Sequence, residues 1–165
     1  MKAGVLLAAA ILQPSTAVVA SVGNVPDASL VIAGAIGKPL NLSSAELAAM
    51  PHVTVTRIDH GNQVTCNGVP IAMILQRAGL PSGEALRGAA LTTVLIAAGR
   101  DGYKVALTLG ELDTSLGNAG AVVADRCGDQ PIPPAVGPLR LILPKDNRPA
   151  RSVRQLERLT VLQGL

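Results

Sequence analysis

The basic residues of this 165-residue chain are concentrated near its C-terminus. Six of its fourteen lysines and arginines lie between positions 140 and 158, where Asp146 and Glu157 are the only acidic residues. The six are Arg140, Lys145, Arg148, Arg151, Arg154 and Arg158. Arginine offers planar, paired donors that suit phosphate or carboxylate, and Ser152 adds a hydroxyl. This stretch is a candidate anion site; the alternative is a solvated surface whose ion pairs contribute little.

The chain lacks the sequence motifs of several common sites. It contains no GxSxG, P-loop, GxGxxG, HExxH or CxxC run, so hydrolase, nucleotide-binding and zinc functions have no support. One tyrosine is its only aromatic residue, so the ring platforms on which single-stranded nucleic acids stack are missing. A net charge of +3 is also too small to favour a nucleic-acid partner, and none is expected.

The N-terminus has the parts of a secretory signal peptide in their usual order. Met1 and Lys2 start the chain, residues 3–12 form an apolar run, and residues 18–20 (VVA) offer a cleavage site before Ser21. We therefore predict a signal peptide over residues 1–20 and a polar tail over residues 21–28, with a periplasmic or secreted location. The apolar run is shorter than the roughly 20 residues that span a bilayer. No transmembrane segment is expected.

Cys66 and Cys127 are the only cysteines. In an exported chain an even number of cysteines favours a disulfide, whereas two small buried side chains are the alternative. Their spacing does not show that they meet. We predict that they lie close enough to be bridged, which requires Cα atoms within about 7 Å of each other.

Hydrophobic periodicity and turn residues predict short strands with brief helices between them. Helices are expected after Ser43, between Pro70 and Gly79, and after Thr108, where capping residues or a terminal glycine mark the ends. Strands are expected at residues 29–34, 53–58, 63–66, 89–98, 103–108, 121–124, 139–143 and 159–162. Residues 29–165 are therefore expected to form a single α+β domain.

Five segments, in the same order along the chain, resemble a known family. They are residues 68–71 (GVPI), 101–103 (DGY), 124–132 (ADRCGDQPI), 137–141 (GPLRL) and 151–153 (RSV). The pattern is similar to that of the sulfite-oxidase-like, molybdopterin-binding oxidoreductase superfamily in its short exported form. The resemblance implies the α+β sulfite-oxidase-like fold, with mixed short strands, and molybdopterin as the family's cofactor.

The resemblance also contains a departure at the metal ligand. Active members carry a molybdenum-binding cysteine in a run like CxGN; here residues 59–62 read DHGN, with Asp59 in place of the cysteine. A hard carboxylate and a soft thiolate favour different metals. Cys66 lies seven residues further on and is expected to pack or to form the disulfide rather than to replace that ligand. We therefore expect a degenerate site that holds no metal.

The resemblance assigns cofactor-contacting positions to two segments. They are Asp59, His60, Asn62, Arg140, Arg151, Ser152 and Arg154. His60 is either an acid or base or simply a turn residue. The family fold implies that the first three residues lie near the basic C-terminal segment. Arg151 and Arg154 would share one face if that segment formed a helical turn.

These residues lead to a favoured hypothesis about function and to alternatives. The favoured one is an exported, degenerate molybdopterin-binding-like domain without a cofactor, whose basic groove binds a small anion or a partner protein. The alternative is an active molybdopterin-dependent oxidoreductase with an altered metal ligand, and a purely structural exported module is a third. Fold likeness does not by itself decide function, so whether the chain is an enzyme stays open at this point.

Overall fold

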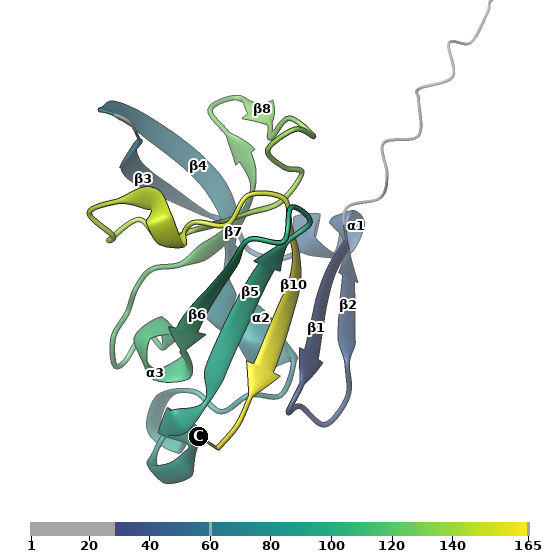
Figure 1. The fold of residues 1–165 in the computed structure, drawn as a ribbon, viewed down its shortest axis with the longest axis vertical. Helices are drawn as coiled ribbons and strands as arrows, with labels where there is room; N and C mark the ends of the chain where they lie inside the picture. Colours follow the sequence, from purple (N-terminus) through teal and green to yellow (C-terminus); the bar gives the residue numbers. More distant parts are fainter. Residues whose placement is uncertain (1–28, 60, 165) are drawn as a thin grey trace, which may run out of the picture.

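The computed structural model describes residues 29–59 and 61–164 (Figure 1). The predicted signal peptide and polar tail, and His60, lie outside the described residues. The strands are β1 (Ser29–Gly34), β2 (Leu40–Ser43), β3 (Val53–Asp59), β4 (Asn62–Pro70), β5 (Val94–Gly99), β6 (Lys104–Thr108), β7 (Val122–Cys127), β8 (Gln130–Pro131), β9 (Arg140–Ile142) and β10 (Leu156–Leu162). The helices are α1 (Ser44–Ala48), α2 (Ile71–Arg77) and α3 (Leu109–Leu112), with 3-10 turns at Gly83–Ala85, Gly88–Thr92 and Pro149–Arg151. None of the described helices is long and apolar enough to cross a membrane.

The first sheet has the strand order β2-β1-β10-β5-β6 and carries the main hydrophobic core. β1 and β10 are parallel, and the other pairs are antiparallel. Successive side chains of a strand point to opposite faces, so Leu30 and Ile32 of β1 are both fully buried. Helix α2, behind the sheet in Figure 1, buries Ile71, Ile74 and Leu75 in the same core.

The second sheet has the order β3-β4-β7-β8, and β9 also pairs with β7. It carries a smaller apolar cluster: Cys66, Val122, Ala124, Ile132 and Ile142. Cys66 and Cys127 face each other across β4 and β7, with Cα atoms 4.0 Å apart, and form a disulfide. The predicted bridge is confirmed.

Just beyond the disulfide, the backbones of β4 and β7 come into close contact. A Cβ atom on Gly68 would lie 2.4 Å from the carbonyl oxygen of Val123 and 2.5 Å from the Cα of Ala124. Only glycine fits there, and the pairing register shifts between Asn67 and Gly68. The disulfide and this close contact together attach the long β3–β4 hairpin to the rest of the second sheet.

The α+β class is confirmed, and several predicted elements differ in extent. β4 continues to Pro70, beyond the predicted end at Cys66, and β10 begins at Leu156 rather than at Leu159. The short strands β2 and β8 were not predicted. Helix α1 follows the expected capping box of Ser43 and Glu46. The apolar run predicted as one strand over residues 89–98 begins instead as the 3-10 turn Gly88–Thr92, and β5 starts only at Val94. Gly88 has a φ of +57°, a left-handed conformation that starts a turn rather than a strand. Periodicity alone does not reveal that conformation.

Candidate functional site

Strand β3 carries a buried arginine, Arg57, on the same face as Val55. Val55 packs against the smaller apolar cluster, and the alternation of a strand places Arg57 and Asp59 on the same face. Arg57 is 7% exposed, whereas the neighbouring Ile58 is 62% exposed. Arg57 was not among the residues predicted for the site, although its alternation with Val55 in the sequence was a signal for a position on the same face.

The Arg57 guanidinium joins the β3–β4 hairpin to the C-terminal segment. Its Nη1 donates a hydrogen bond to Ser152 Oγ at 2.7 Å, and its Nη2 lies 3.1 Å from Asp59 Oδ1. In Figure 1 the yellow-green segment that precedes β10 passes beside this hairpin. The prediction that Asp59 lies near the basic C-terminal segment is therefore confirmed.

Ser152 is positioned by backbone pairing between its own segment and β9. The amide and carbonyl groups of Leu141 and Val153 exchange two hydrogen bonds, of 2.9 and 3.1 Å. Ser152 Oγ accepts from Arg57 and, at 3.5 Å, from the amide of Leu143. A hydroxyl has one donor and two acceptor positions, so its O–H is still available to donate to a ligand.

Arg140, at the start of β9, has a buried donor that no described residue satisfies. Its Nε is buried and has no hydrogen-bond partner among the described residues. Burial lowers the pKa of Arg140, and the positive charges of Arg57 and Arg154 lower it further, against a smaller opposite effect of Asp59. We call Arg57, Arg140, Arg154 and Asp59 the arginine cluster. It holds three guanidinium groups against one carboxylate.

Arg154 is exposed and lines a pocket of about 220 Å³. The pocket is bounded by Asp101, Tyr103, Pro149, Ala150, Ser152 and Arg154. Arg154 makes no hydrogen bond or ion pair with any residue that the structure describes. A second pocket, of about 390 Å³, lies between the β3–β4 hairpin and residues 144–147 and includes Arg57. Arg154 and Arg57 of the arginine cluster thus line two separate pockets.

Arg151 has a different environment from the arginine cluster. Its Nε and Nη2 donate to the two oxygens of Asp146 at 2.9 and 2.7 Å, and its Nη1 donates to Glu111 at 2.9 Å. The hydrogen bonds to Asp146 raise the pKa of Arg151. The helical turn ends at Arg151, and Gln155 has a φ of +49°, so the turn that would place Arg151 and Arg154 on one face does not form. The guanidinium of Arg151 is occupied by carboxylates.

Asn62 lies at the tip of the β3–β4 hairpin, paired across it with Asp59, and it is exposed. His60, between them in sequence, is outside the described residues. The structure therefore brings Asp59, Arg140, Ser152 and Arg154 together through Arg57. It leaves Asn62 at the periphery.

The donor set does not fit a molybdenum centre of the family type. Both cysteines are in the disulfide, so neither provides a thiolate, and Asp59 is ion-paired with Arg57. Within residues 29–59 and 61–164, no three histidine, cysteine, aspartate or glutamate side chains gather where they could hold a metal ion. Guanidinium groups do suit the phosphate of a pterin cofactor, but no reaction step follows from these residues through a metal.

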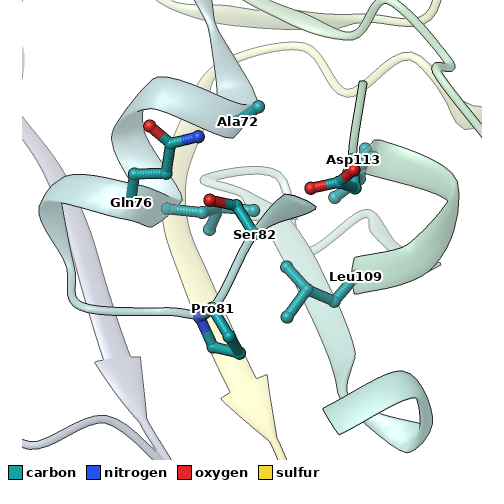
Figure 2. A pocket seen from close by; sticks show the side chains of 8 residues that line it. Ala72, Gln76, Pro81, Ser82, Leu109 and Asp113 are labelled. Atoms are coloured by element: carbon teal, nitrogen blue, oxygen red, sulfur yellow. The ribbon is translucent and has the colours of Figure 1, made fainter. Parts of the chain in front are cut away.

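Another small cavity lies between α2 and α3 and is structural (Figure 2). Its volume is about 10 Å³, room for no more than one water. Asp113, at its edge, accepts hydrogen bonds from the amide of Gly83 and from the amide and hydroxyl of Ser115. The Ser115 hydroxyl is the main cause of the lowered pKa of Asp113. A carboxylate with this many local donors holds two loops together and has little capacity left for a ligand.

Comparison with known proteins places this fold in a family. The family model for the oxidoreductase molybdopterin binding domain matches residues 18–164. The chain belongs to this family, and the predicted sulfite-oxidase-like fold is confirmed.

A solved structure supports the same fold. The sulfane dehydrogenase SoxCD from Paracoccus pantotrophus is similar, with a TM-score of 0.64 and 17% sequence identity. The match covers 81% of this chain and 38% of that chain, so this chain spans well under half of that protein, and at this identity the likeness concerns the fold alone. A search of curated proteins gives no significant match.

Proposed function

We propose that this chain is a non-redox member of the molybdopterin-binding family whose arginine cluster binds a small anion. The observation that carries the proposal is Arg140, whose Nε is buried without a hydrogen-bond partner among the described residues. A buried charged donor of this kind is costly unless something pairs with it. An anion bound by Arg154 would bring a negative charge close to Arg140 and offset the repulsion within the cluster.

The position of the family's metal ligand supports a non-redox function. The residue that replaces the family's cysteine is Asp59, and it faces Arg57 at 3.1 Å. We infer that Asp59 has become part of an ion pair that positions Ser152 through Arg57. An active oxidoreductase with a carboxylate ligand is the alternative, favoured by family membership alone; it requires Asp59 to exchange Arg57 for a metal.

We also propose that the protein functions outside the cytosol. A disulfide between its only two cysteines is typical of oxidising compartments such as the periplasm or the extracellular space. The signal-peptide pattern of residues 1–20 supports the same location. Western blotting of periplasmic and cytosolic fractions from the native host checks this directly.

Calorimetric titration with inorganic phosphate and sulfate tests the anion site. We expect Arg140→Met to weaken phosphate binding at least about tenfold, the equivalent of one charge-assisted hydrogen bond. The same change should preserve or raise the melting temperature, because it removes a desolvated charge among like charges. Arg148→Gln is the matched control: it removes an exposed arginine from the same stretch and should change the affinity less than twofold.

Equal, weak and salt-sensitive binding by wild type and Arg140→Met would contradict the proposed site. A second measurement separates the two candidate functions. Elemental analysis of protein purified from the native exported compartment should find no stoichiometric molybdenum. One molybdenum atom per chain would favour the oxidoreductase instead.

A further inference from the structure

We propose that the ligand of this site is a small zwitterion, with its anionic group at Arg154 and Ser152 and its ammonium group at Asp101. This inference rests on the anion site proposed above and names its ligand class. Its starting point is the pocket of about 220 Å³ that Arg154 and Asp101 both line. Ligand pockets for drug-sized molecules measure about 300–1,000 Å³, so this one suits something smaller.

The pocket holds opposite charges that do not neutralise each other. Asp101 and Arg154 have no ion pair within 4.0 Å, either with each other or with any other described residue. Elsewhere on the surface, arginines do find carboxylates, as Arg100 does with Glu157 at 3.8 Å and Arg77 with Glu46 at 3.3 Å. A ligand that carries both charges could bridge the unpaired acid and base.

The two backbone segments that carry Asp101 and Arg154 pack directly against each other. Gly99, just before Asp101, is packed so tightly that a Cβ atom would lie 2.4 Å from the carbonyl oxygen of Arg154. The amide of Arg100 donates to the carbonyl of Gln155 at 3.0 Å, and Gln155 itself has a φ of +49°. The β5–β6 turn and the segment before β10 are thus joined backbone to backbone. Asp101 and Arg154 therefore line the same pocket from two segments whose backbones are in contact.

Asp101 is oriented for a cation by its own turn. Its Oδ1 accepts a hydrogen bond of 3.0 Å from the amide of Tyr103, and its Oδ2 has no partner among the described residues. Tyr103, the only aromatic residue of the chain, lines the same pocket and donates its hydroxyl to the carbonyl of Ala150. An aromatic ring face attracts ammonium groups. Asp101 and Tyr103 therefore give the pocket two groups suited to a cation.

Two other residues that line the pocket are suited to an anion. Among the described residues, the O–H of Ser152 and the N–H donors of Arg154 have no partner, so they are available to a ligand. Asp101 would repel a plain anion and attract an ammonium group on the same molecule. The pocket is therefore expected to prefer an aminoalkyl phosphate, sulfonate or carboxylate over the same anion without its amine.

Two ligand pairs of matched shape test this preference by calorimetric titration. They are phosphoethanolamine against ethyl phosphate, and β-alanine against propionate. In each pair we expect the zwitterion to bind about fivefold more tightly, the effect of one exposed ion pair. Asp101→Asn should abolish that difference without weakening ethyl phosphate, since Asn retains the acceptor for the Tyr103 amide and suits the Asn-Gly turn. Asp129→Asn, which removes an exposed carboxylate in the β7–β8 turn, is the matched control and should leave the preference intact.

The outcomes separate this inference from the anion site on which it rests. If both members of each pair bind equally to the wild type, and binding still depends on Arg140, the anion site stands and the zwitterion is wrong. If neither member of either pair binds, both proposals fail. A preference that persists in Asp101→Asn would also overturn the assignment of Asp101.

Discussion

Two groups of arginines lie within the same basic stretch of this chain, and they differ in the carboxylates around them. Arg151 donates to both Asp146 and Glu111, so one positive charge meets two negative ones. In the arginine cluster, by contrast, three guanidinium groups share the single carboxylate of Asp59. A basic run in a sequence therefore does not locate an anion site. We propose that the number of carboxylates that the fold brings to each guanidinium is the better guide.

The two groups also differ in how charge affects folding. The pKa of Arg151 is raised by its hydrogen bonds to Asp146, whereas the pKa of Arg140 is lowered by burial and by its arginine neighbours. For a basic group, a raised pKa in the folded state means that the charged form stabilises the fold, and a lowered pKa means that it destabilises it. A charged side chain that destabilises the fold is therefore a candidate for a functional role.

Removing the disulfide is expected to have the largest effect on stability. The disulfide joins β4 to β7 and so supports the β3–β4 hairpin, which carries Arg57 but not Arg151. Cys66→Ala with Cys127→Ala opens a cross-link between residues 61 positions apart, which chain-entropy arguments value at about 4 kcal/mol of unfolding free energy. Urea denaturation measures the loss. Phosphate binding should weaken with it, since the β3–β4 hairpin carries Arg57. An unchanged denaturation midpoint would show that the second sheet does not depend on the bridge.

Breaking the Arg57–Asp59 pair should have the next largest effect. Arg57→Met leaves Asp59, whose side chain is 16% exposed, without this counter-charge, and we expect a loss of about 3 kcal/mol. Arg57→Met with Asp59→Leu should recover most of that loss, because both members of the buried pair are then apolar. A double-mutant cycle of unfolding free energies measures the coupling. Additive single effects would mean that the two charges do not act as a pair.

Single substitutions of Arg151 and Arg154 should have the smallest effects on stability, but they should separate the two groups most clearly in phosphate affinity. Arg151→Ala should lower the unfolding free energy by about 1 kcal/mol, since its side chain is 42% exposed and its ion pairs are screened, and it should leave phosphate affinity unchanged. Arg154→Ala should change stability by less than about 0.5 kcal/mol and should abolish most of the phosphate binding. Thermal denaturation and titration of both variants check this. If both variants lost affinity equally, the distinction between the groups would be wrong.

Much of the fold could be predicted from the sequence because its signals are local. The Ser43 capping box, the helix between Pro70 and Gly79 and the alternation of β3 depend on residues a few positions apart. The extent of β5 was harder to predict. The run over residues 89–98 predicted one strand, but its first residues form a 3-10 turn that contains no buried residue, and the backbone conformation at Gly88 separates this turn from β5.

The sequence by itself determined the α+β class, the order of the family's motifs, the even pair of cysteines and the basic character of residues 140–158. The tertiary structure decided which of those charges are satisfied. Arg57 meets Ser152 across 95 residues of sequence and Arg151 meets Glu111 across 40. Contacts at such separations depend on how the two sheets pack, not on local spacing, because a charge is neutralised only by what lies within a few ångströms of it. Arg151 and Arg154 cannot be told apart in the sequence. In the fold, Arg151 is paired with carboxylates, whereas Arg154 lines the candidate site.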